Sequence, residues 1–241
     1  MKILLLALPR TGSKFVHRNI DRYLAVDNPT VKLTNDSQTG EWYEPLYQRI
    51  KFLGDNGNVI TEEDKTIIKS ETSLNNAIDI IPKLSKDLVI KYHHVKGIRD
   101  IEKQFISLFD KVYLLHRRKY FESALSFALS DYFDSWIPNV SQRDKIAKSL
   151  VKKIDLDEES WINIIQSFKE LRNLEIPGVS KIFFEDMIQL KSSKEFCEHL
   201  GLPFKDFNIV TDQEIEFGKN KYSMITNLDR LVELFKEEMA K

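Results

Sequence analysis

The chain opens with Met1-Lys2-Ile3-Leu4-Leu5-Leu6-Ala7-Leu8-Pro9-Arg10-Thr11-Gly12-Ser13-Lys14-Phe15, an apolar run that passes through a short polar turn into an amphipathic segment. The uninterrupted apolar run at residues 3–8 is typical of a strand covered on both faces, and such strands occur mainly in parallel α/β sheets. Beyond Gly12, apolar residues recur at helical spacing and predict a helix over residues 14–24. The opening therefore predicts strand, turn and helix in that order, the first unit of an α/β fold.

The same alternation continues along the chain. Short apolar runs predict further strands at 88–92, 112–116 and 181–184. Amphipathic spacing predicts helices at 98–109, 143–153, 158–174, 192–200 and about 227–239, with a further apolar stripe at positions 121, 125, 128 and 132. We therefore expect a three-layer α/β fold, with a mostly parallel central sheet flanked by helices. No repeat or Pro/Gly linker divides the chain, so residues 1–241 are expected to form a single domain, with irregular loops or insertions at 34–60 and 134–142.

Composition excludes several classes of protein. With 241 residues, 42% of them hydrophobic and 30% charged, the chain is neither disordered nor collagen-like. Its net charge of -1 gives no general attraction to nucleic acid or to anionic membranes. The single cysteine, Cys197, excludes an internal disulfide framework, and no Cys/His spacing predicts a metal site. The first apolar run is too short for a signal peptide and no stretch is long enough to span a membrane, so we expect a cytoplasmic protein.

Positive charge nevertheless collects after three of the predicted strands. The first strand is followed by Arg10 and Lys14, the second contains Lys91 and leads into His93, His94 and Lys96, and the third leads into Arg117-Arg118-Lys119. Two of these turns open a helix, whose N-terminus already carries about half a positive charge and favours an acidic residue by about 0.3 to 1 kcal/mol. Because the carboxyl ends of parallel strands share one edge, this pattern predicts a polyanionic ligand spanning two helix N-termini.

The first turn does not fit the P-loop of kinases and NTPases, GxxxxGK[ST]. Counted back from Gly12, the first glycine position holds Ala7, the lysine position holds Ser13, and the Ser/Thr position holds Lys14. No acidic residue closes a predicted strand to hold magnesium, as phosphoryl transfer requires. A nucleotide-dependent phosphotransferase therefore stays an alternative only.

Four segments instead resemble motifs of the sulfotransferases that use 3′-phosphoadenosine-5′-phosphosulfate (PAPS). Residues 9–15 resemble the family's phosphosulfate-binding loop except at Lys14. Residues 91–93, Lys-Tyr-His, are similar to a Lys-Thr-His that ends a strand in the cytosolic branch. Residues 118–126 are similar to the 3′-phosphate motif, an Arg followed by an acidic residue four positions on and a Ser eight positions on, although the usual Asp/Asn-Pro after the Arg is replaced by Lys-Tyr. Residues 182–187, Ile-Phe-Phe-Glu-Asp-Met, resemble the family's late strand-Glu-Asp element.

The resemblance implies a P-loop-like fold and roles for individual residues. It assigns the 5′-phosphosulfate to the backbone N–H groups and hydroxyls of Thr11, Gly12 and Ser13, and the charge that develops at the bridging oxygen to Arg10. Lys14 either adds charge at the same phosphate or points to solvent. The 3′-phosphate is assigned to Arg118 and Ser126, and a weaker match adds the basic residues Lys219 and Lys221.

The resemblance also implies how the sulfuryl acceptor is handled. His93 is the expected general base, with His94 as its neighbouring alternative, and Lys91 is expected to hold the sulfonate oxygens. Candidates for lining an acceptor pocket are the aromatic residues Trp42, Tyr43, Tyr132, Phe133 and Trp136. PAPS is the expected co-substrate, and no metal is required. The acceptor is left open, because a histidine base could take the proton from a carbohydrate, lipid, phenol or peptide hydroxyl. A non-catalytic protein that binds the same nucleotide is the remaining alternative.

Overall fold

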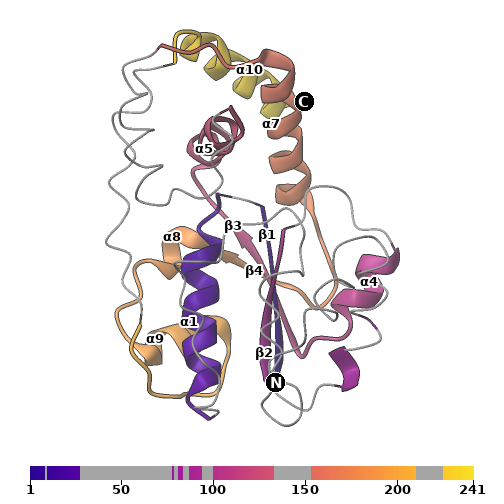
Figure 1. The fold of residues 1–241 in the computed structure, drawn as a ribbon, viewed down its shortest axis with the longest axis vertical. Coiled ribbons are helices and arrows are strands. Elements are labelled where there is room, and N and C mark those ends of the chain that lie inside the picture. The colour runs from indigo at the N-terminus through magenta and orange to yellow at the C-terminus, as the bar shows by residue number, and fades with distance from the viewer. Residues whose placement is uncertain are drawn as a thin grey trace, which may run out of the picture.

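The structure is a computed structural model that describes residues 1–8, 10–27, 78, 81–83, 87–93, 100–132, 153–209 and 225–241, with the backbone alone at Lys14, Lys83, Leu88 and His93. Its strands are β1 (Lys2–Ala7), β2 (Leu88–His93), β3 (Lys111–His116) and β4 (Ser180–Phe183). Its helices are α1 (Ser13–Ala25), α4 (Asp100–Ile106), α5 (Tyr120–Tyr132), α7 (Glu158–Asn173), α8 (Phe184–Met187), α9 (Ser193–Leu200) and α10 (Leu228–Ala240), with a short 3₁₀ turn, η2, at Ile81–Lys83 (Figure 1).

The four predicted strands are confirmed, each to within one residue of its expected ends. The prediction for the last one needs a small correction, because β4 ends at Phe183 and Phe184 begins the single turn α8. The helices predicted near 14–24, 158–174, 192–200 and 227–239 are also confirmed, and the stripe at 121–132 lies on α5. The helix predicted at 98–109 is shorter, from Asp100 to Ile106. The helix predicted at 143–153, apart from its last residue, and the irregular segments 34–60 and 134–142 lie outside the described residues.

All the described strands are parallel, in the order β2-β1-β3-β4. Alternate residues of β1 and its continuation enter two separate cores. Ile3, Leu5 and Ala7 pack in a core with residues of α1, α8 and α9 on one face. Leu4, Leu6 and Leu8 pack with residues of α4, α5, α7 and α10 in the other core. The burial of both faces of β1 confirms the expected three-layer α/β fold.

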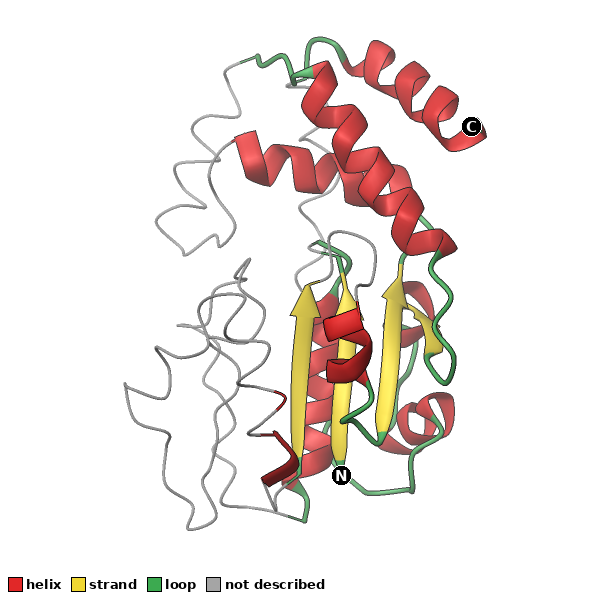
Figure 2. Ribbon diagram, turned by 90° about the vertical axis from the view of Figure 1, so that its right-hand side faces the viewer, coloured by secondary structure: helices red, strands yellow, loops and turns green. Residues whose placement is uncertain are grey.

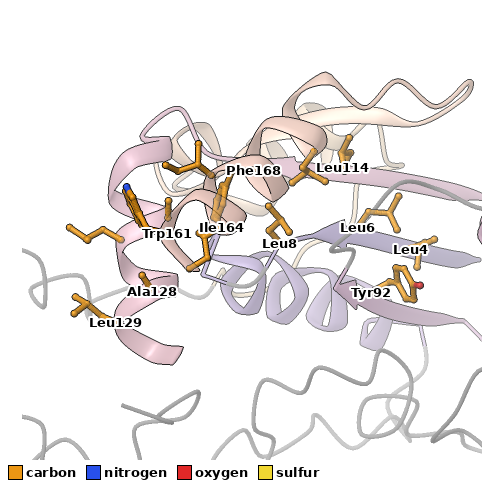
Figure 3. Close-up of a cluster of buried hydrophobic side chains, with 14 of the residues drawn as sticks. Leu4, Leu6, Leu8, Tyr92, Leu114, Ala128, Leu129, Trp161, Ile164 and Phe168 are labelled. Carbon is orange, nitrogen blue, oxygen red and sulfur yellow. The ribbon is translucent and has the colours of Figure 1, made fainter. Parts of the chain in front are cut away.

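Three helices lie beyond the carboxyl ends of the strands. Figure 1 shows α5, α7 and α10 together at one end of the sheet, and the strand arrows in Figure 2 point toward them. The core joins the two parts, since Leu8 at the end of β1 belongs to the same buried cluster as Trp161 and Phe168 of α7 (Figure 3). This packing holds α5 directly beyond the strand ends, where the sequence predicts a ligand.

Within the described parts of the chain, no helix combines the length and the apolar character that crossing a bilayer requires.

Candidate active site

The carboxyl ends of β1, β2 and β3 meet at one edge of the sheet. Ala7 of β1 pairs with His93, the last residue of β2, on one side and with Leu115 of β3 on the other. The chain passes from β1 to β2 on one side of β1 and then crosses to β3 on its other side, so the strand order reverses between β1 and β3. In open α/β sheets, ligands bind in the crevice at such a reversal. The candidate site is therefore the pair of turns that follow β1 and β3.

The turn after β1 has an unusual backbone. Arg10 and Gly12 have positive φ angles of 65° and 83°, while Thr11 between them does not. Alternating signs of φ along three residues turn successive N–H groups toward one side, which favours a concave surface for an anion. The Thr11 hydroxyl donates a hydrogen bond of 2.7 Å to the Leu8 carbonyl, so its proton is used inside the turn.

The N-terminus of α1 lacks the acidic side chain that the other described α-helices carry. Each of these has an Asp or Glu in its first turn, and at α7 the Asp157 side chain also accepts a hydrogen bond from the backbone N–H of Ser160. In α1 the N-cap is Gly12, and the Ser13 hydroxyl is buried without a hydrogen-bond partner in the part of the chain that the structure describes. Free N–H groups and an unpartnered hydroxyl at a helix N-terminus form a site for an external anion.

The turn depends on glycine at position 12 because of α8. A Cβ atom added to Gly12 would lie 2.2 Å from two ring carbon atoms of Phe184. That ring is buried, and it also contacts Phe15 edge-on, with 6.0 Å between the ring centroids. Phe184 therefore supports the turn from the side, and only glycine allows this close approach.

A hydrogen bond joins two of the motifs predicted from the sequence. Arg10 Nε donates to Ser126 Oγ of α5 at 3.3 Å, across 116 positions of the chain. One helical turn earlier on α5, the Ser123 hydroxyl is fully buried and has no hydrogen-bond partner among the described residues. The residues expected to bind the 5′-phosphosulfate and the 3′-phosphate thus meet at the same edge of the sheet.

The positive charge of the turn after β3 is partly balanced within the protein, because two carboxylates of α8 meet its three basic residues. Arg118 donates from Nη1 and Nη2 to the two carboxylate oxygens of Asp186, at 2.6 and 2.8 Å. The Glu185 carboxylate accepts hydrogen bonds from the backbone N–H groups of Arg118 and Lys119, at 2.9 and 3.4 Å. Burial raises the pKa of Glu185, but these hydrogen bonds and the charge of Arg117 outweigh it and lower the pKa overall. Of the two helix N-termini predicted to need an anion, α5 therefore receives carboxylates from α8, whereas α1 does not.

His116 is a polar residue at this edge that the sequence analysis missed. It ends β3, is buried, and its Nδ1 lies 3.1 Å from the Tyr120 hydroxyl, while Nε2 has no hydrogen-bond partner among the described residues. Burial, with a smaller contribution from the charge of Lys181, lowers the pKa of His116 from 6.5 to about 4. Its place as the last residue of a buried strand, directly before the arginine pair, is the signal that identifies it.

This pKa predicts how the protein responds to acid. Below pH 6.5 the unfolded chain binds a proton at His116 that the folded chain does not bind, so stability falls as the pH decreases from 6.5 to 4, by at most about 1.4 kcal/mol per pH unit. Urea unfolding at pH 7, 6 and 5 measures the slope, and His116→Phe is expected to flatten it. An equal slope in both proteins would contradict the assignment to His116.

The structure places the remaining predicted residues as follows. Lys91 is 3% exposed, and it pairs with Leu5 of β1, on the sheet face that α1 covers, rather than standing at the strand end. Lys14 lies in the first turn of α1 and His93 at the end of β2, each with its backbone alone described. Tyr132, at the end of α5, is 49% exposed. The predicted residues outside the described parts of the chain are His94, Lys96, Lys219, Lys221, Trp42, Tyr43, Phe133 and Trp136.

The chain has little sequence similarity to the known proteins with which it was compared. No protein-family model matches this chain, and no curated protein matches it. Among solved structures, the chain is similar to one described as "Sulfotransferase Domain from the Curacin Biosynthetic Pathway", with 12% sequence identity and a TM-score of 0.42 over 97% of this chain and 96% of that one. At this identity and score, the function has to be argued from the site itself.

Proposed function

We propose that the protein is a sulfotransferase that moves the sulfuryl group of PAPS to a hydroxyl or amine of an acceptor. The observation that supports this best is the hydrogen bond between Arg10 and Ser126, because it joins the turn resembling a phosphosulfate loop to the helix resembling a 3′-phosphate motif. The positive φ angles at Arg10 and Gly12 and the unpartnered hydroxyl of Ser13 add a concave, cationic surface for the 5′-phosphosulfate.

In this proposal the transfer occurs in line. The bond between sulfur and the bridging phosphate oxygen breaks, a new bond forms between sulfur and the acceptor atom, and the acceptor's proton passes to His93. Negative charge builds up on the bridging oxygen as it leaves. Arg10 stabilises this charge without losing a proton, because a guanidinium stays charged at any working pH. His93 lies at the same edge of the sheet as the turn that holds Arg10, because it pairs with Ala7 at the end of β1.

The 3′-phosphate of the nucleotide is proposed to bind between Arg118 and Ser126. A guanidinium has five N–H donors, and Asp186 uses one at each terminal nitrogen of Arg118. The remaining donors are available to a phosphate, while the carboxylate holds the guanidinium in one orientation. With a side-chain exposure of 51%, Arg118 is accessible to a ligand.

Thermal unfolding in the presence of nucleotides tests the proposal. Adenosine 3′,5′-bisphosphate (PAP) at 100 times its Kd is expected to add about 2.7 kcal/mol of stability, hence roughly 5 to 10 °C of Tm for a chain of this length. ADP, which carries no 3′-phosphate, is the matched control and is expected to give a much smaller shift. Equal Tm shifts with PAP and ADP, or no shift with either, would contradict the proposal.

Two further outcomes distinguish the alternatives. Magnesium-dependent turnover of ATP, with equal stabilisation by ADP and PAP, would indicate a phosphotransferase instead. Tight binding of PAP without sulfuryl transfer from PAPS to any of a panel of carbohydrate, lipid, phenol and peptide acceptors would indicate a nucleotide-binding protein that lacks the reaction.

A further inference from the structure

The two adjacent arginines after β3 turn in different directions. The Arg117 side chain is 21% exposed, and its Nη1 lies 3.5 Å from the backbone carbonyl oxygen of Arg10, in the turn after β1. The Arg118 side chain is 51% exposed, and it pairs with Asp186 instead. Arg117 thus faces the proposed 5′-phosphosulfate turn, although the motif resemblance points to Arg118 alone.

The turn after β1 needs a contact of this kind. Arg10 has a φ of 65°, a left-handed conformation that costs a residue with a Cβ about 1 to 2 kcal/mol. Such a conformation persists only where the surroundings hold it. A charged donor at the Arg10 carbonyl opposes rotation of that peptide group, and it thereby holds the backbone that aims the Arg10 side chain at Ser126.

Arg117 is itself held in place from α8. Its guanidinium lies 4.7 Å from the centre of the Phe184 ring, and its Nε lies 3.6 Å from a carboxylate oxygen of Glu185. The same Phe184 ring occupies the space beside Gly12. The two positive-φ residues of the turn, Arg10 and Gly12, are therefore supported by one unit made of Arg117, Phe184 and Glu185.

We propose that Arg117 is a positioning residue for the 5′-phosphosulfate turn, acting through the backbone of Arg10, and that Arg118 serves the 3′-phosphate. This inference rests on the proposed function and deepens it by dividing the arginine pair between the two ends of one nucleotide. Removing the Arg117 donors disturbs the 5′ end of the site, which every 5′-nucleotide uses. Removing those of Arg118 disturbs only nucleotides that carry a 3′-phosphate.

Binding of AMP and PAP, measured by titration calorimetry, separates the two roles because these nucleotides differ only in the 3′-phosphate. Arg117→Gln is expected to weaken both nucleotides by the same factor, roughly tenfold, the loss typical of a hydrogen bond from a charged group. Arg118→Gln, the matched control at the next position, is expected to weaken PAP by roughly tenfold and to leave AMP unchanged. Arg117→Lys keeps a charged donor and is expected to recover part of the lost affinity for both.

Two results for Arg117→Gln would overturn the inference. If Arg117→Gln weakens PAP but not AMP, Arg117 acts at the 3′-phosphate; if it changes neither, it does not position the turn. The Tm of each variant without nucleotide shows whether the fold is intact, and Arg117→Lys supplies the same comparison should Arg117→Gln fail to fold. If the unaltered protein binds neither nucleotide, the proposed function is wrong and this inference falls with it, whereas normal binding with unchanged Arg117 variants overturns the inference alone.

Discussion

Gly12→Ala is expected to lower the free energy of unfolding by at least about 3 kcal/mol, which corresponds to roughly 6 to 12 °C of Tm for a chain of this length. Two costs combine. The new Cβ would lie 2.2 Å from the buried ring of Phe184, and a residue with a Cβ would have to adopt a φ of 83°. Calorimetric unfolding of the purified variant measures the loss. Binding of PAP is expected to decrease as well, because the turn shifts.

A second glycine separates these two costs. Gly178 also has a positive φ, of 78°, but an added Cβ there meets nothing within 4 Å. Gly178→Ala therefore carries the backbone cost alone, about 1 kcal/mol. Combining Gly12→Ala with Phe184→Leu is expected to recover part of the steric cost and none of the backbone cost. A loss at Gly12 no larger than the loss at Gly178 would show that Phe184 does not support the turn.

The layers of the fold were predictable because they depend on patterns within short segments. A strand buried on both faces shows as an uninterrupted apolar run, such as residues 3–8, whatever lies elsewhere in the chain. The helix ending before Gly201 was predictable for a similar reason, since a glycine with φ of 59° closes it. The short helix α8 has too few residues to show a period, and its existence was not predicted.

The site was predictable only in part, because its contacts join distant segments. The sequence predicted that a polar turn follows β1, and it also predicted that His93 lies at the same edge of the sheet as this turn. The pairing of Glu185 and Asp186 with the arginine turn is a tertiary contact that no local pattern contains. For the same reason, the sequence predicted an anion at the N-termini of both α1 and α5, although α5 is served by carboxylates of the protein.

Arg10→Ala is expected to reduce the rate of sulfuryl transfer by about 10² to 10³, the loss typical of removing one preorganised donor to a developing charge. The fold is expected to survive, because the Arg10 side chain lies beyond the end of β1, is only partly buried and donates a hydrogen bond to the Ser126 hydroxyl. Release of radiolabelled sulfate from PAPS, in which water takes the sulfuryl group, measures the rate without requiring the natural acceptor. The Kd for PAP should change much less than the rate, since the charge that Arg10 is proposed to stabilise is largest in the transition state.

Two other variants show whether that loss belongs to the guanidinium of Arg10 itself. Arg22→Ala removes an arginine of α1 whose contact, to the Asn208 carbonyl, lies on the exposed surface, and it is expected to leave the rate unchanged. Ser126→Ala removes one hydrogen-bond partner of Arg10 but keeps the charge of Arg10, so the rate should fall less than in Arg10→Ala while the affinity for PAP decreases. If Arg10→Ala transfers sulfuryl groups as fast as Arg22→Ala, the charge on the leaving oxygen is stabilised elsewhere, and the role of the turn after β1 is limited to binding.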